Sequence, residues 1–584
     1  TIATVSVSIR LDMQPVAHIG LVGAYAVPFL VGGEGSLASF FIYMVIINTG
    51  VLATTLYKYW KKLTYTAFLF TWLIVGWWYG GDYTAETDFG ITITYVLIFF
   101  LIFYMTALSY KLLRVREFER GDVWLILANA FLFYAFGFVM MDGADLNFSW
   151  AGLFTAGNAL IHSAAAIIVY RAGFADRKLL WLITGLAITF FTLAIPVELD
   201  GSWVTLLWSA EAALLFTIGR KSQTAFYERM SHPVLALAFL SLLNVWDNAY
   251  SLYAIEASES GFLPLFNIHF FTSIFFIGCT GWIVWKGREQ STPPAGPYKN
   301  PQFNKLIVQL TRLVFIGVLF TAFLQEINGF FNHLYAASKS VTGLEGGAVF
   351  ISGNEDLLNF RTVWGFTYAM LFTGTAILLL TDRIKKHEFS VLLFIASSVI
   401  SVFFLLGGLD ALDHLHFSYL NPESNPGYSA GPFHIGIRYI SFVFLGYMIA
   451  MTGRMCYRTK ELSVTNLTQA FDGLAAIVLL WVLSDELMLW MDISEAEQPY
   501  RLGLSILWGV YALAAIALGI WTDKKHLRIG AIVLLGVTLV KLFFYDLADL
   551  DAIARTVVFV ILGLLLLLAS YLYNKYRKEP DIEE

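Results

Sequence analysis

The chain has 584 residues, of which 58% are hydrophobic, 16% are aromatic and only 14% are charged. Soluble globular domains carry roughly 25% charged residues, so this composition excludes a water-soluble protein. The net charge of −6 comes without a basic block, which also excludes a nucleic-acid partner.

Apolar runs of about twenty residues recur from one end of the chain to the other, and each is long enough to cross a bilayer as a helix. We take the first run, residues 14–33, as a span because no basic segment precedes it and no cleavage site follows it. The runs pair into hairpins that restart near residues 14, 63, 123, 178, 232, 305, 389, 468 and 529. We therefore predict an all-α fold, a single transmembrane domain over residues 1–584 with about eighteen spans in about nine helical hairpins.

The segments between the runs alternate in charge. One set is short and basic, as in YKYWKK, RKSQTAFYER and TDKKHLR, and the other is acidic, as in GGDYTAETD, DGADLN and DISEAEQ. Among the 37 lysines and arginines, the acidic set holds only Lys339, Arg361, Arg438, Arg501 and Arg555. Because positive residues stay on the cytoplasmic side during insertion, we predict that both termini are cytoplasmic and that the acidic loops face outward.

The hairpins resemble one another in sequence. The outgoing helix tends to end in aspartate, as in FVMMD, LLNVWD and LWMD, and the returning helix opens with a polar or basic residue before an aromatic-rich run. This pattern suggests duplication of a two-helix unit.

Four arginines begin returning helices at the predicted outer side: Arg361, Arg438, Arg501 and Arg555. A cation at a helix N-terminus opposes the helix dipole and needs a partner. The expected partners are Asp410 or Asp413 for Arg438, Asp485 or Asp492 for Arg501, and Asp546 or Asp549 for Arg555. One interpretation is an ion pair that closes each hairpin, and the other is an outward-facing anion-binding site. The acidic surroundings favour the ion pair.

Glu211, in LLWSAEAALLF, is the one carboxylate that we place in the middle of a span. An ionised carboxylate is costly there unless it is paired or faces water. We therefore expect it to face protein or a polar cavity, either as a tie between helices or as a proton or cation relay. Lys541 and Arg312 are the only cations that we place within spans.

The richest outer cluster is DALDHLHF, with Asp410, Asp413, His414 and His416. Carboxylates and imidazoles can ligate a divalent metal or perform acid–base chemistry. The spacing matches no zinc signature, and capping of the helix end explains the residues more simply, so we assign no metal ligand. No P-loop, G-x-G-x-x-G, G-x-S-x-G or H-E-x-x-H motif is present to indicate a cofactor.

The segments LDGSWVTLLWSAEAALLFTIG and LRIGAIVLLGVTLVKLFFYDL resemble those of a large bacterial family of predicted polytopic membrane proteins of unknown function. The resemblance covers most of the chain and implies a location in the bacterial inner membrane. Many members carry a soluble, often coiled-coil segment before the spans, and the resemblance allows for such a segment upstream of Thr1. It assigns no catalytic residue.

Three functions fit this pattern. The first is transport or flipping of a cell-envelope substrate, because repeats and buried charges are common in transporters. The second is a membrane enzyme that modifies an envelope lipid or glycan, using the carboxylates and histidines of the outer loops near residues 326–356 and 410–434. The third is a scaffold for partner proteins, which the sequence does not identify.

Overall fold

A computed structural model describes most of the chain. The described residues are 7–8, 11–31, 36–58, 60–114, 119–143, 150–171, 177–256, 262–288, 297–298, 300–345, 348–381, 387–421, 428–458, 465–494, 500–542, 556, 560, 563–564 and 567.

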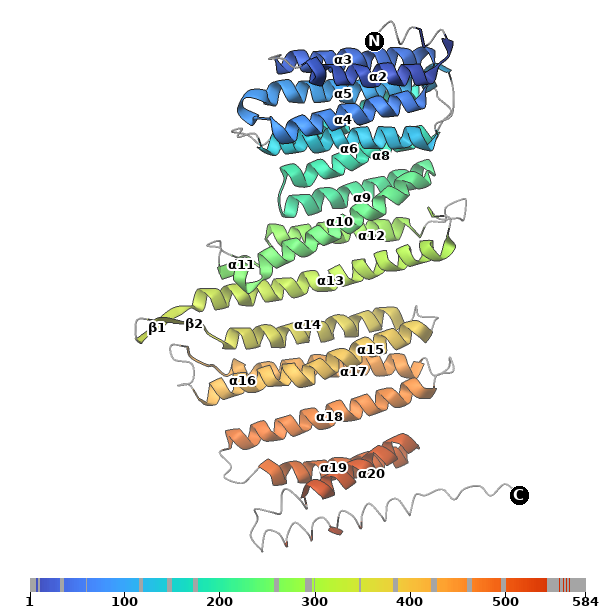
Figure 1. The fold of residues 1–584 in the computed structure, drawn as a ribbon. Coiled ribbons are helices and arrows are strands. Elements are labelled where there is room, and N and C mark those ends of the chain that lie inside the picture. The colour runs from blue at the N-terminus through green and yellow to red at the C-terminus, as the bar shows by residue number, and fades with distance from the viewer. Residues whose placement is uncertain are drawn as a thin grey trace, which may run out of the picture. The chain divides into compact units, whose positions relative to one another are not determined.

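The chain divides into two compact units, residues 1–245 with 272–315 and residues 246–271 with 316–584. The first unit contains α2 (Gln14–Val31), α3 (Leu37–Tyr57), α4 (Lys61–Gly81), α5 (Ala85–Arg114), α6 (Arg120–Gly143), α7 (Ala151–Arg171), α8 (Arg177–Glu198), α9 (Ser202–Ser222), most of α10 (Ala225–Tyr250), α12 (Ile268–Lys286) and the start of α13 (Pro301–Ser338). The second contains the end of α10, α11 (Leu252–Glu256), the rest of α13, β1 (Ser340–Glu345), β2 (Ala348–Ser352), α14 (Asp356–Thr381), α15 (His387–Phe403), η1 (Phe404–Gly408), α16 (Leu409–Leu420), α17 (Phe433–Arg458), α18 (Thr465–Ile493), α19 (Tyr500–Trp521) and α20 (Lys525–Lys541) (Figure 1).

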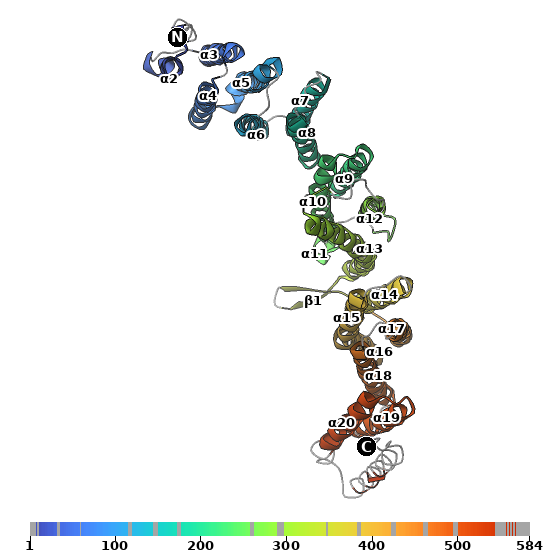
Figure 2. The same ribbon diagram turned by 90° about the vertical axis from the view of Figure 1, so that its right-hand side faces the viewer.

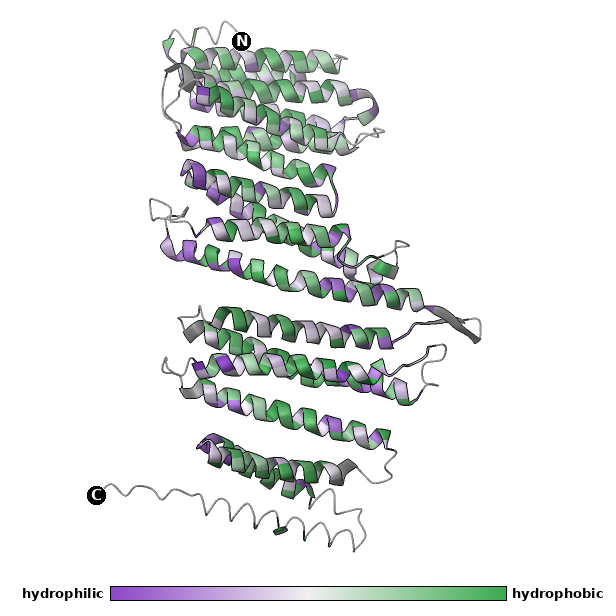
Figure 3. Cartoon of the chain, turned by 180° about the vertical axis from the view of Figure 1, so that it is seen from behind, coloured by the Kyte–Doolittle hydropathy of each residue, from purple (hydrophilic) through white to green (hydrophobic). Residues whose placement is uncertain are grey.

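Within the described residues, 13 helices are long and apolar enough to cross a membrane. Within each unit most helices run in similar directions, so that Figure 2 shows them nearly end-on. Hydrophobic residues dominate the middle portions of these helices (Figure 3). The prediction of a multi-pass helical protein is therefore confirmed. Helices also begin near the predicted hairpin starts, for example at Lys61, Arg120 and Arg177. The total of eighteen spans and the duplication of hairpins stay predictions.

Two details differ from the sequence-based expectation. Strands β1 and β2 pair antiparallel, so the segment between α13 and α14 contains a β-hairpin in an otherwise helical structure. Helix α13 continues to Ser338 and places Glu326, which we had assigned to an outer loop, about 18 Å before its end. Glu326 is buried, so Glu211 is not the only acid well inside a long helix. The run NGFFNHLYAAS contains no proline, and the helix continues through its one glycine, Gly329, where an added Cβ would lie 2.6 Å from Tyr250.

The first unit is held by aromatic packing and a few buried polar contacts. Phe41, Phe99 and Phe133 belong to one core cluster of buried side chains. Asn48 on α3 accepts a hydrogen bond from Tyr25 on α2 (2.6 Å) and donates one to Thr71 on α4 (3.0 Å). Because all three side chains are buried, these bonds fix how three apolar helices meet.

The second unit packs α14 against α16 and α17, and α17 against α18. At the α14–α17 contact, a Cβ added to Gly374 would lie 2.6 Å from Tyr447 and 3.3 Å from the Cα of Met448. Glycine is therefore what allows these helices to approach so closely. A π-helical turn, η1, joins α15 to α16 without a break. Such turns insert one extra residue per turn and are frequent at functional sites.

Candidate functional site

Three helices of the second unit bring charged side chains together. Helix α16 carries Asp413 as its fifth residue, about one turn after η1. Helix α17 carries Arg438 near its N-terminus, and α18 carries Asp485 and Glu486 about 12 Å before its end. The pattern of each helix alone does not show that these residues meet. Their meeting depends on the packing of α16, α17 and α18.

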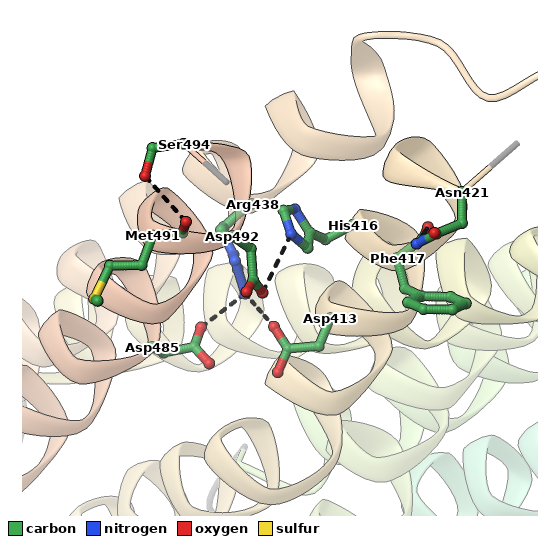
Figure 4. A network of polar contacts seen from close by, with 9 residues as sticks. All are labelled: Asp413, His416, Phe417, Asn421, Arg438, Asp485, Met491, Asp492 and Ser494. Carbon is green, nitrogen blue, oxygen red and sulfur yellow. Dashed lines mark hydrogen bonds and ion pairs between the residues drawn. The ribbon is translucent and has the colours of Figure 1, made fainter. Parts of the chain in front are cut away.

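Arg438 lies at the centre of this cluster (Figure 4). Its Nη2 is 2.6 Å from Asp413 Oδ1 and 2.8 Å from Asp485 Oδ2, and its Nε is 3.5 Å from Glu486 Oε1. The Arg438 side chain is only 1% exposed, whereas Asp485 is 5% and Asp413 is 55% exposed. The guanidinium is thus a buried cation held between an interior and a surface carboxylate. The expected contact between Arg438 and Asp413 is present, and Asp485, which we had assigned to Arg501, joins it.

The cluster contains more negative than positive charge. Three carboxylates surround one guanidinium, which leaves two surplus negative charges when all four groups are ionised. Two carboxylates about 5 Å apart repel by about 3 kcal/mol at an effective dielectric constant of 20. Arg438 also has two buried nitrogens, Nε and Nη1, without a hydrogen-bond partner among the described residues. The site therefore has both surplus charge and unused donors.

The other residues of the DALDHLHF cluster divide into two groups. His416 is buried, and its Nε2 lies 3.7 Å from Asp492 Oδ2, which places it beside the Arg438 cluster (Figure 4). Asp410 and His414 are exposed, and no hydrogen bond or ion pair joins either to another described residue. No group of three or more His, Cys, Asp or Glu side chains in the described part of the chain is arranged to hold a metal ion.

A second polar group joins the two regions, near residues 326–356 and 410–434, that we predict to be outer loops. Asp356, at the start of α14, accepts a hydrogen bond from Ser418 (2.7 Å) and lies 3.4 Å from His434 Nε2. His434 Nδ1 is 3.1 Å from the carbonyl oxygen of Gly431. The aspartate lies between the serine and the histidine, so this arrangement ties helix ends together and does not place the imidazole beside the Ser418 hydroxyl.

The remaining arginines that we predict at the outer side have different surroundings. Arg361 donates a 2.6 Å hydrogen bond to the amide oxygen of Asn332, and Asn332 in turn donates to the carbonyl oxygen of Tyr250 (2.9 Å). No ion pair joins Arg361 to a described carboxylate, so this position differs from Arg438. The Arg501 side chain and the whole of Arg555 lie outside the described residues.

Glu211 lies in the first unit and is 8% exposed. Its Oε1 accepts a 2.7 Å hydrogen bond from Thr192 on α8, and Trp208 donates to the carbonyl oxygen of the same threonine (2.9 Å). Its Oε2 is buried without a hydrogen-bond partner in the described structure. The Glu211 side chain therefore faces α8. Lys541, one of the two cations that we place within spans, donates a hydrogen bond to Ser505.

Sequence reasoning did not single out several buried acids, among them Glu326 and Asp472. Glu326 accepts hydrogen bonds from the Tyr250 hydroxyl, from Asn267 Nδ2 (3.0 and 3.1 Å) and from the Leu265 amide (2.6 Å). Asp472, near the start of α18, lies 2.8 Å from both Lys524 and His526. Glu326 lies in an apolar helix, and Asp472 lies close in sequence to a basic loop. Neither position indicates that the side chain is buried against residues far away in the sequence.

Lys524 lies outside the helices, in the turn before α20. Burial lowers the pKa of its ammonium group, but hydrogen bonds to Asp472 and Tyr457 outweigh burial and raise the pKa of Lys524 above its usual value. The ammonium therefore stays charged and fixes α20 to α18 at the predicted cytoplasmic side.

In the comparison with known proteins, one family model covers almost the whole chain. A family model described as "Predicted membrane protein (DUF2339)" matches residues 1–576. No curated protein matches the chain, and no solved structure matches it.

Proposed function

This chain belongs to the DUF2339 family of predicted membrane proteins, and we propose that it is a proton-driven transporter that moves an amphiphilic envelope molecule across the bacterial inner membrane. The observation that carries this proposal is the buried Arg438 guanidinium with three carboxylates at 2.6, 2.8 and 3.5 Å. Intramembrane clusters with surplus charge are typical of proton and ion pathways.

The charge balance suggests how the cluster would work. Two protons, taken up by two of the three carboxyl groups, would leave one ion pair and no net charge. Loss of these protons would leave two surplus negative charges within α16, α17 and α18, which would favour a more hydrated arrangement of these helices. Asp413 is half exposed and Asp485 is buried, so the pair offers a route from the surface to the interior.

The positions of the other charged groups support this assignment. His416 and Asp492 lie beside the cluster on α16 and α18, and Tyr439 on α17 donates to Glu486 (3.2 Å). On α14, Asp356 already contacts Ser418 and His434 and is occupied elsewhere. Proton exchange would therefore centre on Asp413, Asp485 and Glu486.

Proton flux into liposomes tests the proposal. The full chain is reconstituted into vesicles of bacterial polar lipid, which also supply amphiphilic substrate, with a potassium ionophore to balance charge. We expect the wild type to dissipate an imposed pH gradient faster than protein-free vesicles. Asp485→Asn should lose most of this flux, whereas the exposed Asp410→Asn should retain it.

Equal rates for wild type, Asp485→Asn and protein-free vesicles would refute proton coupling. A membrane enzyme would instead change the chemical composition of the vesicle lipids, which mass spectrometry of the same sample detects. A scaffold would do neither.

A further inference from the structure

A cavity of about 560 Å³ lies between the end of α10 and the facing sides of α13 and α14. This volume is within the usual range for small-molecule sites. All of its lining residues belong to the second unit, and none of them belongs to the Arg438 cluster. The cavity is therefore a separate place in the molecule at which a ligand could bind.

The lining changes in character along the helix axes. Arg361 on α14 bonds Asn332 on α13, and Tyr368, about two turns further along α14, bonds Phe320, which is earlier on α13. Helices α13 and α14 therefore run antiparallel. From Arg361 to Ala369 the lining covers about 12 Å along α14. The level of Arg361 is polar, whereas the deeper wall is formed by Leu324, Phe366 and Ala369, with Gln325 as the polar exception.

Two opposite charges line this cavity without forming an ion pair with each other. Arg361 uses one of its five N–H groups on Asn332, and no other described residue accepts a hydrogen bond from it, so the remaining groups can bind a ligand. Asp247, on α10, lines the same cavity and is exposed. Asn332 is itself held by the Tyr250 carbonyl oxygen, so the guanidinium is fixed in position before any ligand arrives.

We propose that this cavity binds the headgroup of a zwitterionic phospholipid, with the phosphate on Arg361 and the ammonium group on Asp247. Guanidinium groups bind phosphate through paired charge-assisted hydrogen bonds, and a carboxylate binds an ammonium group in the same way. The apolar wall below accommodates the first part of an acyl chain. An anionic headgroup that carries the phosphate without an ammonium group leaves Asp247 without a counter-charge, so it should bind more weakly.

This lipid would be the substrate class of the proposed transporter. Because binding is measured without transport, the lipid site and proton-driven transport can each be refuted independently. The delipidated full chain in detergent is titrated with short-chain phosphatidylethanolamine and, separately, with short-chain phosphatidylglycerol, and binding is measured by calorimetry. We expect phosphatidylethanolamine to bind about tenfold more tightly, because only its ammonium group pairs with Asp247 and one charge pair changes affinity by about that factor.

The variants separate the two charges. Arg361→Gln should weaken both lipids about tenfold or more, because both carry the phosphate. Asp247→Asn should weaken phosphatidylethanolamine alone and so abolish the preference. Asp410→Asn, an exposed outer carboxylate that does not line the cavity, should bind both lipids as the wild type does.

A third arm distinguishes the lipid from its free headgroup. Soluble phosphoethanolamine should compete only at much higher concentration, because it leaves the apolar wall empty. If it binds as tightly as the lipid, the acyl part of the proposal is wrong. If phosphatidylglycerol binds as well as phosphatidylethanolamine, or if Asp247→Asn keeps the preference, the zwitterionic site is wrong.

Discussion

Replacing Arg438 with methionine removes the only cation from the cluster while keeping a long apolar side chain. The side chain is 1% exposed, and Asp485 beside it is 5% exposed, so the carboxylate left behind has little access to water. Removing one partner of a buried ion pair typically costs about 3–5 kcal/mol. We therefore expect Arg438→Met to destabilise the second unit by about that amount.

The two aspartates provide a matched comparison. Asp413→Asn should cost less than about 1 kcal/mol, because the Asp413 side chain is 55% exposed and its ion pair is largely screened. Asp485→Asn should cost about 1.5–3 kcal/mol, since a buried charged hydrogen bond is lost. In the double variant Arg438→Met/Asp485→Asn we expect about 1–3 kcal/mol of the loss to be recovered, because no buried charge is then left alone on Asp485.

The assay is unfolding of the purified protein in mixed micelles with increasing dodecyl sulfate, followed by tryptophan fluorescence. Each 1.4 kcal/mol changes the unfolding equilibrium constant about tenfold, so the expected losses are well resolved. The reasoning would be refuted if Arg438→Met were no more destabilising than Asp413→Asn, or if the double variant showed simple additivity.

Four further outcomes are expected. Single cysteines in the α3–α4 turn should resist an impermeant external thiol reagent, and those in the α4–α5 turn should react; the reverse pattern would overturn the predicted orientation. Gly374→Ala should cost about 1–3 kcal/mol by overpacking the α14–α17 contact, whereas Gly446→Ala, whose added Cβ would meet nothing within 4 Å, should be neutral or slightly stabilising in the same unfolding assay. Asp472→Asn should cost about 2–3 kcal/mol, because its carboxylate lies 2.8 Å from Lys524 and His526, whereas Asp523→Asn at an exposed 3.5 Å pair should cost less than about 1 kcal/mol; equal losses would contradict this. Glu211→Gln should leave the melting temperature nearly unchanged, because an amide oxygen can still accept the Thr192 hydrogen bond, and a large drop would indicate that the charge itself is needed.

The candidate site was only partly predictable. The Arg438–Asp413 contact was anticipated because both residues lie at the predicted outer side of one predicted hairpin, where the connection brings helix ends together. Asp485 was assigned to Arg501, its own hairpin partner, yet it contacts Arg438 on the preceding helix. Pairing by sequence proximity fails here because a buried cation binds the carboxylates that helix packing supplies, whichever hairpin they come from.

The sequence by itself determined that this is a multi-pass helical membrane protein, and it located the helices closely. In lipid every backbone polar group must be satisfied within its own segment, so an apolar run of sufficient length has to be a helix. Only the tertiary structure decided which helix faces meet, where Glu326 and Asp472 find their partners, and that a π-helical turn leads into α16. The reason is that lipid and protein interior are equally apolar, so the hydropathy of a spanning helix does not reveal which of its faces is buried against protein.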